Sequence, residues 1–335
     1  MRRRGDEDGE RDHVSPSGDG LGALRATGPA GHDRPGHLPC HAGRRLTERP
    51  RAPFCADLAR ENDEPLVATA SRIDNWFLIE YRGLWARDAL TGSGLSDQVK
   101  ERLREQVRSV PHGRLLFVRR PDRRRCPELV AFTAASRPSE TTVTRTEFEA
   151  YDDLRGLDLL AGPPAGHPLF LVCTHGKHDP CCARYGRPLY EALRDELDPE
   201  WAWQVSHIGG DRFAGNLVCL PEGLYYGRVD RELAGSVLDE HLAGRISMAN
   251  YRGRSIFTFP VQAAERRLRE REGLVGIDDL SLRRVEREDG SLRVTFAAGA
   301  ETHELRVHEE HGDLTRLTCN SESLERPPRY VVSPP

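Results

Sequence analysis

The alternation of apolar and polar residues across positions 167–229 predicts a strand, a helix and a second strand. Leu169–Val172 is a short apolar run beside a proline, which is typical of a buried strand. Pro188 opens a segment whose leucines recur at the spacing of one helix face: Leu189, Leu193 and Leu197. A second apolar run, Trp201–Val205, predicts the next strand.

Polar and sulfur-bearing residues follow both predicted strands. A strand, helix, strand crossover is almost always right-handed with parallel strands, so we expect Cys173 and His207 to be neighbours at one edge of the sheet. Ligands collect at this edge in α/β proteins. Cys182 precedes the predicted helix, where the helix dipole favours a thiolate. Asp211 follows His207 by four positions, and the glycines at 209–210 leave room for a bulky group.

Residues 51–160 repeat the same order of elements. The predicted order is strand, helix, strand, strand, strand, with these limits: Trp76–Tyr81, a helix capped by Ser96, Leu115–Val118, Leu129–Thr133 and Thr141–Phe148. The central stretch continues with strands at Asn216–Leu220 and Leu224–Val229. We therefore interpret the first half as a structural echo of the second, packed against it, without its cysteine and histidine residues.

The remaining pattern predicts two helices and a small β extension. Asp230 caps a helix with an apolar face formed by Leu233, Val237, Leu238 and Leu242. A charged helix at Val261–Glu272 ends at Gly273, and Asp289-Gly290 is the turn of a hairpin. The sequence thus predicts four parts: a tail at 1–50, an α/β half at 51–160, a second α/β domain at 161–250, and a helix with a β-hairpin extension at 251–335.

Composition and charge narrow the class of protein. The chain has 335 residues, a net charge of -4 and a pI near 6.4, which gives no electrostatic footprint for nucleic acid or an anionic membrane. No apolar run approaches the roughly 20 residues of a membrane span, and the N-terminus lacks the apolar core of a signal peptide. We expect a cytoplasmic protein. Residues 1–50 have few bulky apolar side chains, so we expect a disordered tail, or a start of translation further downstream.

In the cytoplasm the eight cysteines are expected to be reduced or metal-bound. The set Cys-x8-Cys followed by His-x3-Asp has the residue types of a metal or iron–sulfur site. The alternative is that these residues share no metal site. In that case Cys173 is a strand-end cysteine, Cys182 a loop cysteine and His207 a hydrogen-bonded histidine, and Asp211 is a turn residue paired with Arg212. Adjacent side chains usually diverge, so only one of Cys181 and Cys182 is expected to ligate.

The other cysteines and histidines have ordinary interpretations. Cys40 lies near His37 and His41 in the tail, where a site would lack fixed geometry. The single cysteines Cys55 and Cys126 are interpreted as small, partly buried residues, and Cys319 as a structural or surface residue. His175 and His178 either cover a bound group and donate hydrogen bonds to it, or are solvated loop residues.

The stretches CTHGKHDPCCARYGRPLYEAL and HIGGDRFAGNLVCLPEGLYYGRV resemble the sucrase/ferredoxin-like family. PLVATASRIDNWFLIEY, GLWARDAL and YRGRSIFTFPVQAAE resemble it more weakly, so the similarity covers most of the chain after about residue 55. The resemblance implies an α/β fold with a thioredoxin-like ferredoxin core and a [2Fe–2S] cluster. The family motif, Cys-x8-Cys with His-x3-His, implies Cys173 and Cys182 on one iron and His207 on the other. Asp211 stands where the second histidine is expected, and Cys219 is an alternative fourth ligand.

The function implied is a one-electron carrier or redox sensor that exchanges electrons with a redox donor or acceptor protein. An anionic Asp211 ligand would lower the potential and its pH dependence relative to two histidines. We find no carboxylate pair for a glycosidase, so an electron-transfer protein is favoured over a catalyst. The alternatives are a thiol oxidoreductase without metal, a cluster-free structural or binding module, and zinc in a mixed site.

Overall fold

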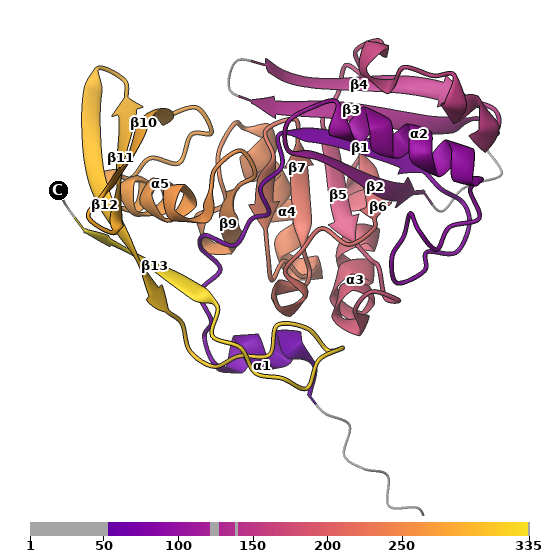
Figure 1. The fold of residues 1–335 in the computed structure, drawn as a ribbon. Coiled ribbons are helices and arrows are strands. Elements are labelled where there is room, and N and C mark those ends of the chain that lie inside the picture. The colour runs from indigo at the N-terminus through magenta and orange to yellow at the C-terminus, as the bar shows by residue number, and fades with distance from the viewer. Residues whose placement is uncertain (1–52, 121–126, 138–139, 334–335) are drawn as a thin grey trace, which may run out of the picture. The chain divides into compact units, whose positions relative to one another are not determined.

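The computed structural model describes residues 53–120, 127–137 and 140–333, which form two β-sheets with helices around them (Figure 1). The tail predicted at 1–50, with Cys40, His37 and His41, lies outside the described residues, and so does Cys126. The larger sheet has nine strands in the order β4-β3-β1-β2-β6-β5-β7-β8-β9. The smaller sheet has the order β10-β11-β12-β13.

The first half of the larger sheet is built around one helix. Its elements are β1 (Asn75–Glu80), α2 (Asp97–Arg108), β2 (Gly113–Arg119), β3 (Leu129–Arg137) and β4 (Glu140–Phe148). Two 3-10 turns follow, η1 (Tyr151–Arg155) and η2 (Leu159–Ala161). Ser96 caps α2 as predicted, because its Oγ accepts a hydrogen bond from the amide of Val99. All four predicted strands and the predicted helix are confirmed.

The second half follows the same plan. Its elements are β5 (Leu169–Cys173), α3 (Pro180–Glu196), β6 (Ala202–Val205), η3 (Asp211–Phe213), β7 (Leu217–Leu220), β8 (Leu224–Tyr226), α4 (Arg231–Leu242), η4 (Met248–Asn250) and β9 (Tyr251–Arg254). The predicted parallel crossover is confirmed, since β5 and β6 pair in parallel. A short helix before both halves, α1 (Cys55–Glu61), and strand β9 were not predicted.

The two halves share one strand topology. In each, the first two strands are parallel neighbours joined by a helix, the third strand is antiparallel to the first, and the fourth is antiparallel to the third. The halves join where β2 pairs with β6, so equivalent edge strands meet. In the second half this order, with α4 after the fourth strand, is the topology of the thioredoxin fold. The predicted echo is therefore supported at the level of topology, and the predicted α/β fold class with its C-terminal β extension is confirmed.

The strand registers give equivalent positions in the two halves. Glu80 ends β1 and Cys173 ends β5, and each faces a valine on its parallel partner strand, Val118 or Val205. Two residues beyond those valines lie Arg120 in the first half and His207 in the second. The first half thus carries Glu80 and Arg120 where the second carries Cys173 and His207. Glu80 and Arg120 form an ion pair.

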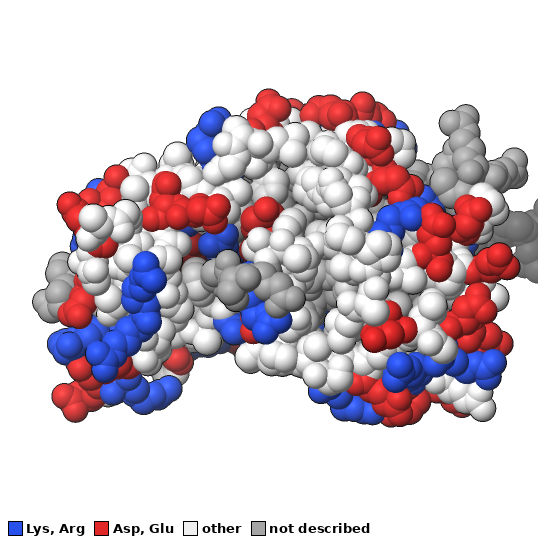
Figure 2. All heavy atoms as spheres, turned by 90° about the horizontal axis from the view of Figure 1, so that it is seen from above, with Lys and Arg blue, Asp and Glu red and all other residues white. Residues whose placement is uncertain are grey.

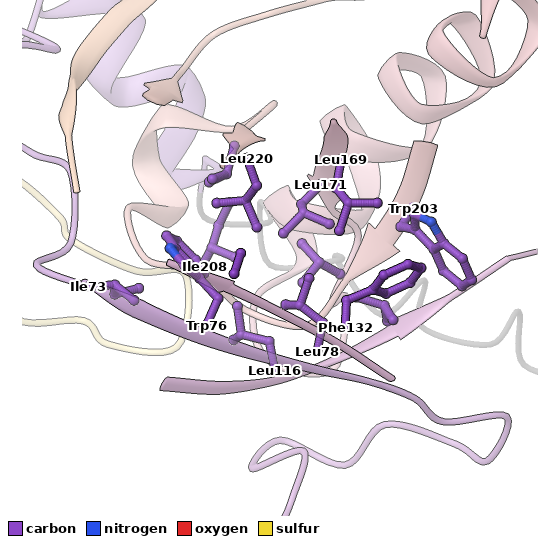
Figure 3. Packing of buried hydrophobic residues seen from close by; sticks show 14 of the residues in the cluster. Ile73, Trp76, Leu78, Leu116, Phe132, Leu169, Leu171, Trp203, Ile208 and Leu220 are labelled. Carbon is purple, nitrogen blue, oxygen red and sulfur yellow. The ribbon is translucent and has the colours of Figure 1, made fainter. Parts of the chain in front are cut away.

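Three apolar clusters hold the larger sheet together. Side chains from both halves meet in one buried cluster between them, in which Leu169 and Leu171 face Trp76 and Leu78 (Figure 3). The outer face of the first half packs against α2, and that of the second against α3 and α4. Because one nine-stranded sheet runs through both halves, the predicted limits 51–160 and 161–250 stay a prediction.

Two helix predictions are wrong in detail. The helix predicted from Pro188 begins eight residues earlier, because Asp179 accepts a hydrogen bond from the amide of Cys181 and Pro180 occupies the first turn. Pro188 lies inside the helix, and Cys182 lies in its first turn rather than before it. In α4, the predicted core residues Leu233 and Leu242 are exposed, and the helix buries other residues instead: Ala234, Val237, Leu238 and His241.

The C-terminal part is a helix packed on the smaller sheet. The helix is α5 (Phe259–Glu272), which ends at Gly273 in the left-handed conformation, as predicted. The strands are β10 (Ser281–Glu288), β11 (Ser291–Ala298), β12 (Glu301–His311) and β13 (Pro328–Ser333), all antiparallel. The predicted hairpin at Asp289-Gly290 is confirmed, and β13 adds a strand that was not predicted. The predicted limits of the C-terminal part, residues 251–335, stay a prediction.

Charges of both signs are interspersed on the face of the molecule that Figure 2 shows. Among the described residues, none of the helices combines the length and the apolar character that crossing a membrane requires. The absence of nucleic-acid and membrane partners stays a prediction.

Candidate metal centre

The parallel pairing of β5 and β6 brings sulfur and nitrogen donors to one edge of the sheet. Cys173 is the last residue of β5, and His207 follows β6 by two residues. The sulfur atoms of Cys173 and Cys182 and a ring nitrogen of His207 lie within 4.8 Å of one another. Both cysteines are buried and His207 is half-buried. The structure therefore brings together three of the four predicted site residues around a single point.

Helix α3 supplies Cys182 from its first turn. The N-cap residue Asp179 fixes the start of the helix, and Gly186 lets the helix approach β5 closely. A Cβ atom at Gly186 would overlap the backbone carbonyl of Cys173, so a larger residue there would push the helix away from the strand. The closeness of Cys173 and Cys182 thus depends on a glycine four positions further along the helix.

Asp211 also joins the site. Its Oδ1 lies 3.0 Å from Nδ1 of His207 and accepts a hydrogen bond from the thiol of Cys182 at 3.3 Å. The alternative pairing of Asp211 with Arg212 is wrong, because Arg212 turns away to the carboxylate of Glu64. Asp211 is therefore an anion directed at the proposed ligands.

Two loop histidines surround the donors, and a loop of the first half orients both. His175 accepts a hydrogen bond on Nδ1 from the amide of His207 (3.2 Å), so its Nε2 carries the proton donated to the carbonyl of Ala86 (2.7 Å). His178 donates from Nδ1 to the carbonyl of Arg87 (3.2 Å), which leaves Nε2 with a free lone pair. These carbonyls belong to the stretch GLWARDAL, which therefore covers the site.

His178, expected from the sequence only to cover a bound group or to be a solvated loop residue, is a further possible ligand. Its ring stacks on His207 with 3.6 Å between centroids, and its Nε2 lies 4.0 Å from Oδ2 of Asp211. His178, His207 and Asp211 form a second group of possible ligands within 4.8 Å. The sequence signal was its position in the loop between two cysteines, which also fits a solvated histidine.

The electrostatics of the site favour one thiolate. The hydrogen bond from Cys182, together with His207, holds the pKa of Cys173 well below its ordinary value despite burial. The same contact and burial raise the pKa of Cys182. At His207, burial opposes the charged ring, but Asp211 and Cys173 outweigh it and raise the pKa to about 9. Burial likewise opposes the charge of Asp211, but His207 keeps the pKa of that carboxyl below its usual value.

The two glycines after His207 make room for an arginine rather than for a bound group. Gly209 and Gly210 have φ of 96° and 80°, in the left-handed region. A Cβ at Gly210 would overlap the guanidinium of Arg252. That guanidinium is fully buried, donates to the carbonyl of Gly209 at 3.1 Å and to Asn216 at 2.8 Å, and has its pKa lowered to about 10 by burial. Arg252 thereby fixes the turn between His207 and Asp211.

Cys219 does not reach the site. It pairs with Phe170 across the ladder and points into the cluster beneath α3 and α4, on the opposite face from Cys173. As an alternative fourth ligand it is excluded by this orientation. The side chain of Cys181, next to Cys182, points away from the candidate metal centre, and its sulfur contacts the sulfurs of Cys55 and Cys319.

The donor set suits a cluster with mixed ligands. Two thiols converge with His207, and Asp211 and His178 compete for a fourth position. Thiolates and imidazoles are the ligands of Rieske-type iron–sulfur centres. The Nδ1 atom of His178 is hydrogen-bonded to a main-chain carbonyl, as is usual for a histidine that holds a metal.

Comparison with known proteins gives a family and several relatives. The family described as Sucrase/ferredoxin-like matches residues 66–253, more than half of the chain. "Altered inheritance of mitochondria protein 32" from Debaryomyces hansenii is 29% identical over 136 residues, 38% of this chain and 48% of that protein. The protein of the same name from Eremothecium gossypii is 32% identical over 109 residues, 28% of this chain and 35% of that protein. The chain spans about half the length of these curated relatives or less.

Among solved structures, a thioredoxin-like [2Fe–2S] ferredoxin from Aquifex aeolicus is 19% identical and covers 27% of this chain and 94% of its own, with a TM-score of 0.24. A variant of the same ferredoxin is 19% identical and covers 25% of this chain and 97% of its own, with a TM-score of 0.23.

Proposed function

Because this chain belongs to the sucrase/ferredoxin-like family, we propose that it holds a [2Fe–2S] cluster at the candidate metal centre and serves as a one-electron carrier or redox sensor. The observation that carries the proposal is the group formed by Cys173, Cys182 and His207 within 4.8 Å at the edge of two parallel strands. The cysteines would hold one iron, and His207 with Asp211 the other. A cluster of this kind supplies reversible one-electron transfer.

The surrounding residues would bind and tune the group. The first turn of α3 places Cys182 at the positive end of the helix dipole, which would stabilise the negative charge of its sulfur once it binds a metal. Asp211 competes with the free Nε2 of His178 for the fourth position, since both face His207. The main-chain carbonyls of Ala86 and Arg87 fix the ring orientation of His175 and His178, which restricts solvent access from the loop side.

A redox partner would dock beside the loop that covers the site. A surface hollow there is lined by basic and apolar residues: Leu84, Arg119, Lys177 and Arg187. Leu84 is 89% exposed, and His178 is the most exposed of the donors. We propose an acidic donor or acceptor protein as the partner. A cytoplasmic location stays a prediction, since the relatives are named for the inheritance of mitochondria.

One observation favours a second candidate function, a thiol oxidoreductase without metal. The lowered pKa of Cys173 and its contact with Cys182 are properties of a reactive dithiol. Both side chains are only 1% exposed, which keeps a thiol substrate from reaching them. Burial therefore supports metal binding over thiol chemistry.

The test is the iron and acid-labile sulfide content of protein purified without oxygen, read together with visible absorption. The variants Cys173→Ser, Cys182→Ser and His207→Ala should lose iron, sulfide and colour. Cys219→Ser is the matched control, because it removes a buried cysteine on the other face of the sheet and should retain the cluster. Colourless, iron-free protein after reconstitution would refute the proposal, and dithiol exchange activity that survives a chelator would favour the second candidate.

A further inference from the structure

Three cysteines from distant parts of the chain meet at a second point, next to the candidate metal centre but separate from it. Cys55 is the first residue of α1, Cys181 lies in the first turn of α3, and Cys319 lies in the segment between β12 and β13. Figure 1 shows α1 beside this C-terminal segment. Cys55 and Cys319 are therefore not isolated, because the fold gathers them beside Cys181.

The sulfur atoms form a nearly equilateral triangle. Cys55 lies 3.6 Å from Cys181 and from Cys319, and Cys181 lies 3.4 Å from Cys319. Three thiolates on one zinc ion, at about 2.3 Å from the metal, would stand about 3.8 Å apart in a tetrahedron. A disulfide would need a separation of about 2.05 Å. The triangle thus has the size of one face of a zinc site and contains no disulfide.

A buried carboxylate holds the triangle together. Asp179 is fully buried; its Oδ1 accepts from the amide of Cys181 at 2.8 Å, and its Oδ2 accepts from the amide of Cys319 and the hydroxyl of Thr318, both at 2.7 Å. One of its oxygens lies within 4.8 Å of all three sulfur atoms. The donors to Asp179 in the described part of the chain are amides, a hydroxyl and, at 3.9 Å, the thiol of Cys55. None of these donors is a cation, and a divalent metal would compensate both the buried carboxylate and the charge of thiolates bound to it.

We propose that Cys55, Cys181 and Cys319 bind one zinc ion, with the carboxylate of Asp179 as the fourth ligand. Zinc accepts sulfur and carboxylate ligands in a closed tetrahedron, as structural sites require. The ion ties α1 and the C-terminal segment to the start of α3. Cys55 and Cys319 both lie outside residues 66–253, so the site belongs to the flanks of this chain rather than to the part matched by the family.

The proposed zinc site is distinct from the proposed cluster, although Asp179 and Cys181 are next to His178 and Cys182 in sequence. Cys182 directs its sulfur to Asp211 and Cys173, while Cys181 directs its sulfur to Cys55 and Cys319. The two side chains diverge, as expected for neighbours, but both have candidate ligand roles. From the sequence, only one of Cys181 and Cys182 was expected to be a ligand. In this proposal each of them is a ligand, Cys181 of the zinc ion and Cys182 of the cluster.

The test measures zinc and iron per chain in the full-length protein, purified under reducing conditions from cells supplied with both metals. The unaltered protein should carry one zinc ion. Cys55→Ser and Cys319→Ser should lose the zinc and keep iron and visible absorption, while Cys173→Ser should keep the zinc and lose iron. Failure of the cluster proposal would therefore leave the zinc result intact. Cys219→Ser, a buried cysteine elsewhere, should keep both metals.

Cobalt titration tests the ligand set by a spectroscopic signature that loss of zinc alone does not provide. The Cys173→Ser variant, freed of zinc by a chelator, should bind one equivalent of Co²⁺ and develop the intense visible bands of a tetrahedral site with thiolate ligands. Asp179→Asn, which retains an N-cap residue, should bind Co²⁺ at least tenfold more weakly. Zinc-free native protein that takes up no cobalt, iron in place of zinc, or a disulfide among the three cysteines by mass spectrometry of the native protein would overturn the proposal.

Discussion

The carboxylate of Glu80 and the guanidinium of Arg120 lie 3.2 Å apart, at positions equivalent to those of Cys173 and His207 in the other half of the sheet. Both side chains of the ion pair are buried, and Glu80 also accepts a hydrogen bond from the amide of Val130. One strand arrangement therefore carries an ion pair in its first copy and candidate metal ligands in its second.

Arg120→Met should destabilise the protein by about 2 kcal/mol, because the buried carboxylate of Glu80 keeps Arg82 as an ionic partner but loses Arg120. Urea unfolding measures the change, and iron content should stay the same. Arg108→Met is the control, since its pair with Glu101 is exposed and screened by solvent and should contribute little to stability. Equal losses in the two variants would show that Glu80 does not need Arg120.

The sequence predicted those parts of the fold whose signal is local. Apolar runs marked β5 and β6, and the handedness of the crossover was enough to expect Cys173 beside His207. The start of α3 was misplaced because Pro188 was taken as the first turn, although Asp179-Pro180 already carried a cap and a first-turn proline.

Other features depend on contacts that no local pattern contains. Cys55 and Cys319 are separated by 264 positions, and only tertiary folding brings them to Cys181. The orientation of His178 depends on a hydrogen bond to the carbonyl of Arg87, a residue in the other half of the chain. The echo of the two halves was predicted from element order, but the equivalence of Glu80 and Cys173 required the registers.

His241 should make stability depend on pH in the alkaline range. It is buried at the end of α4, with Nε2 at 3.5 Å from Oε2 of Glu222; burial opposes its charge, but Cys219 and Glu222 raise its pKa to about 10. The folded state therefore binds this proton more tightly than the unfolded state. Its contribution is complete below about pH 6.5 and is lost as the pH rises towards 10.

The measurement is the difference in unfolding free energy between the native protein and His241→Gln, taken by urea unfolding at a series of pH values. This difference should shrink by about 3 kcal/mol between pH 6 and pH 9. His308→Gln, at an exposed position, is the control and should show no such trend. A difference that stays constant with pH would mean that His241 is neutral in the folded protein.

Asp211→His should raise the midpoint potential of the reconstituted centre and make it more dependent on pH. A neutral imidazole in place of an anionic carboxylate stabilises ferric iron less and carries a second, titratable nitrogen. We expect an increase on the order of 50 to 100 mV in a potentiometric titration. If Asp211→His leaves the potential unchanged while His178→Gln alters it, the fourth position belongs to His178.

Gly186→Ala should damage stability and metal binding together. The added methyl group would overlap the carbonyl of Cys173, and because that atom is backbone, α3 has to move away from β5. We expect a loss of about 3 kcal/mol in urea unfolding and reduced iron loading, since Cys182 moves with the helix. Gly235→Ala in α4 is the matched control: its methyl group meets only the flexible carboxylate of Glu196, so a gain of up to about 1 kcal/mol is expected there. Full iron content and unaltered stability in Gly186→Ala would show that the distance between helix and strand does not set the geometry of the two cysteines.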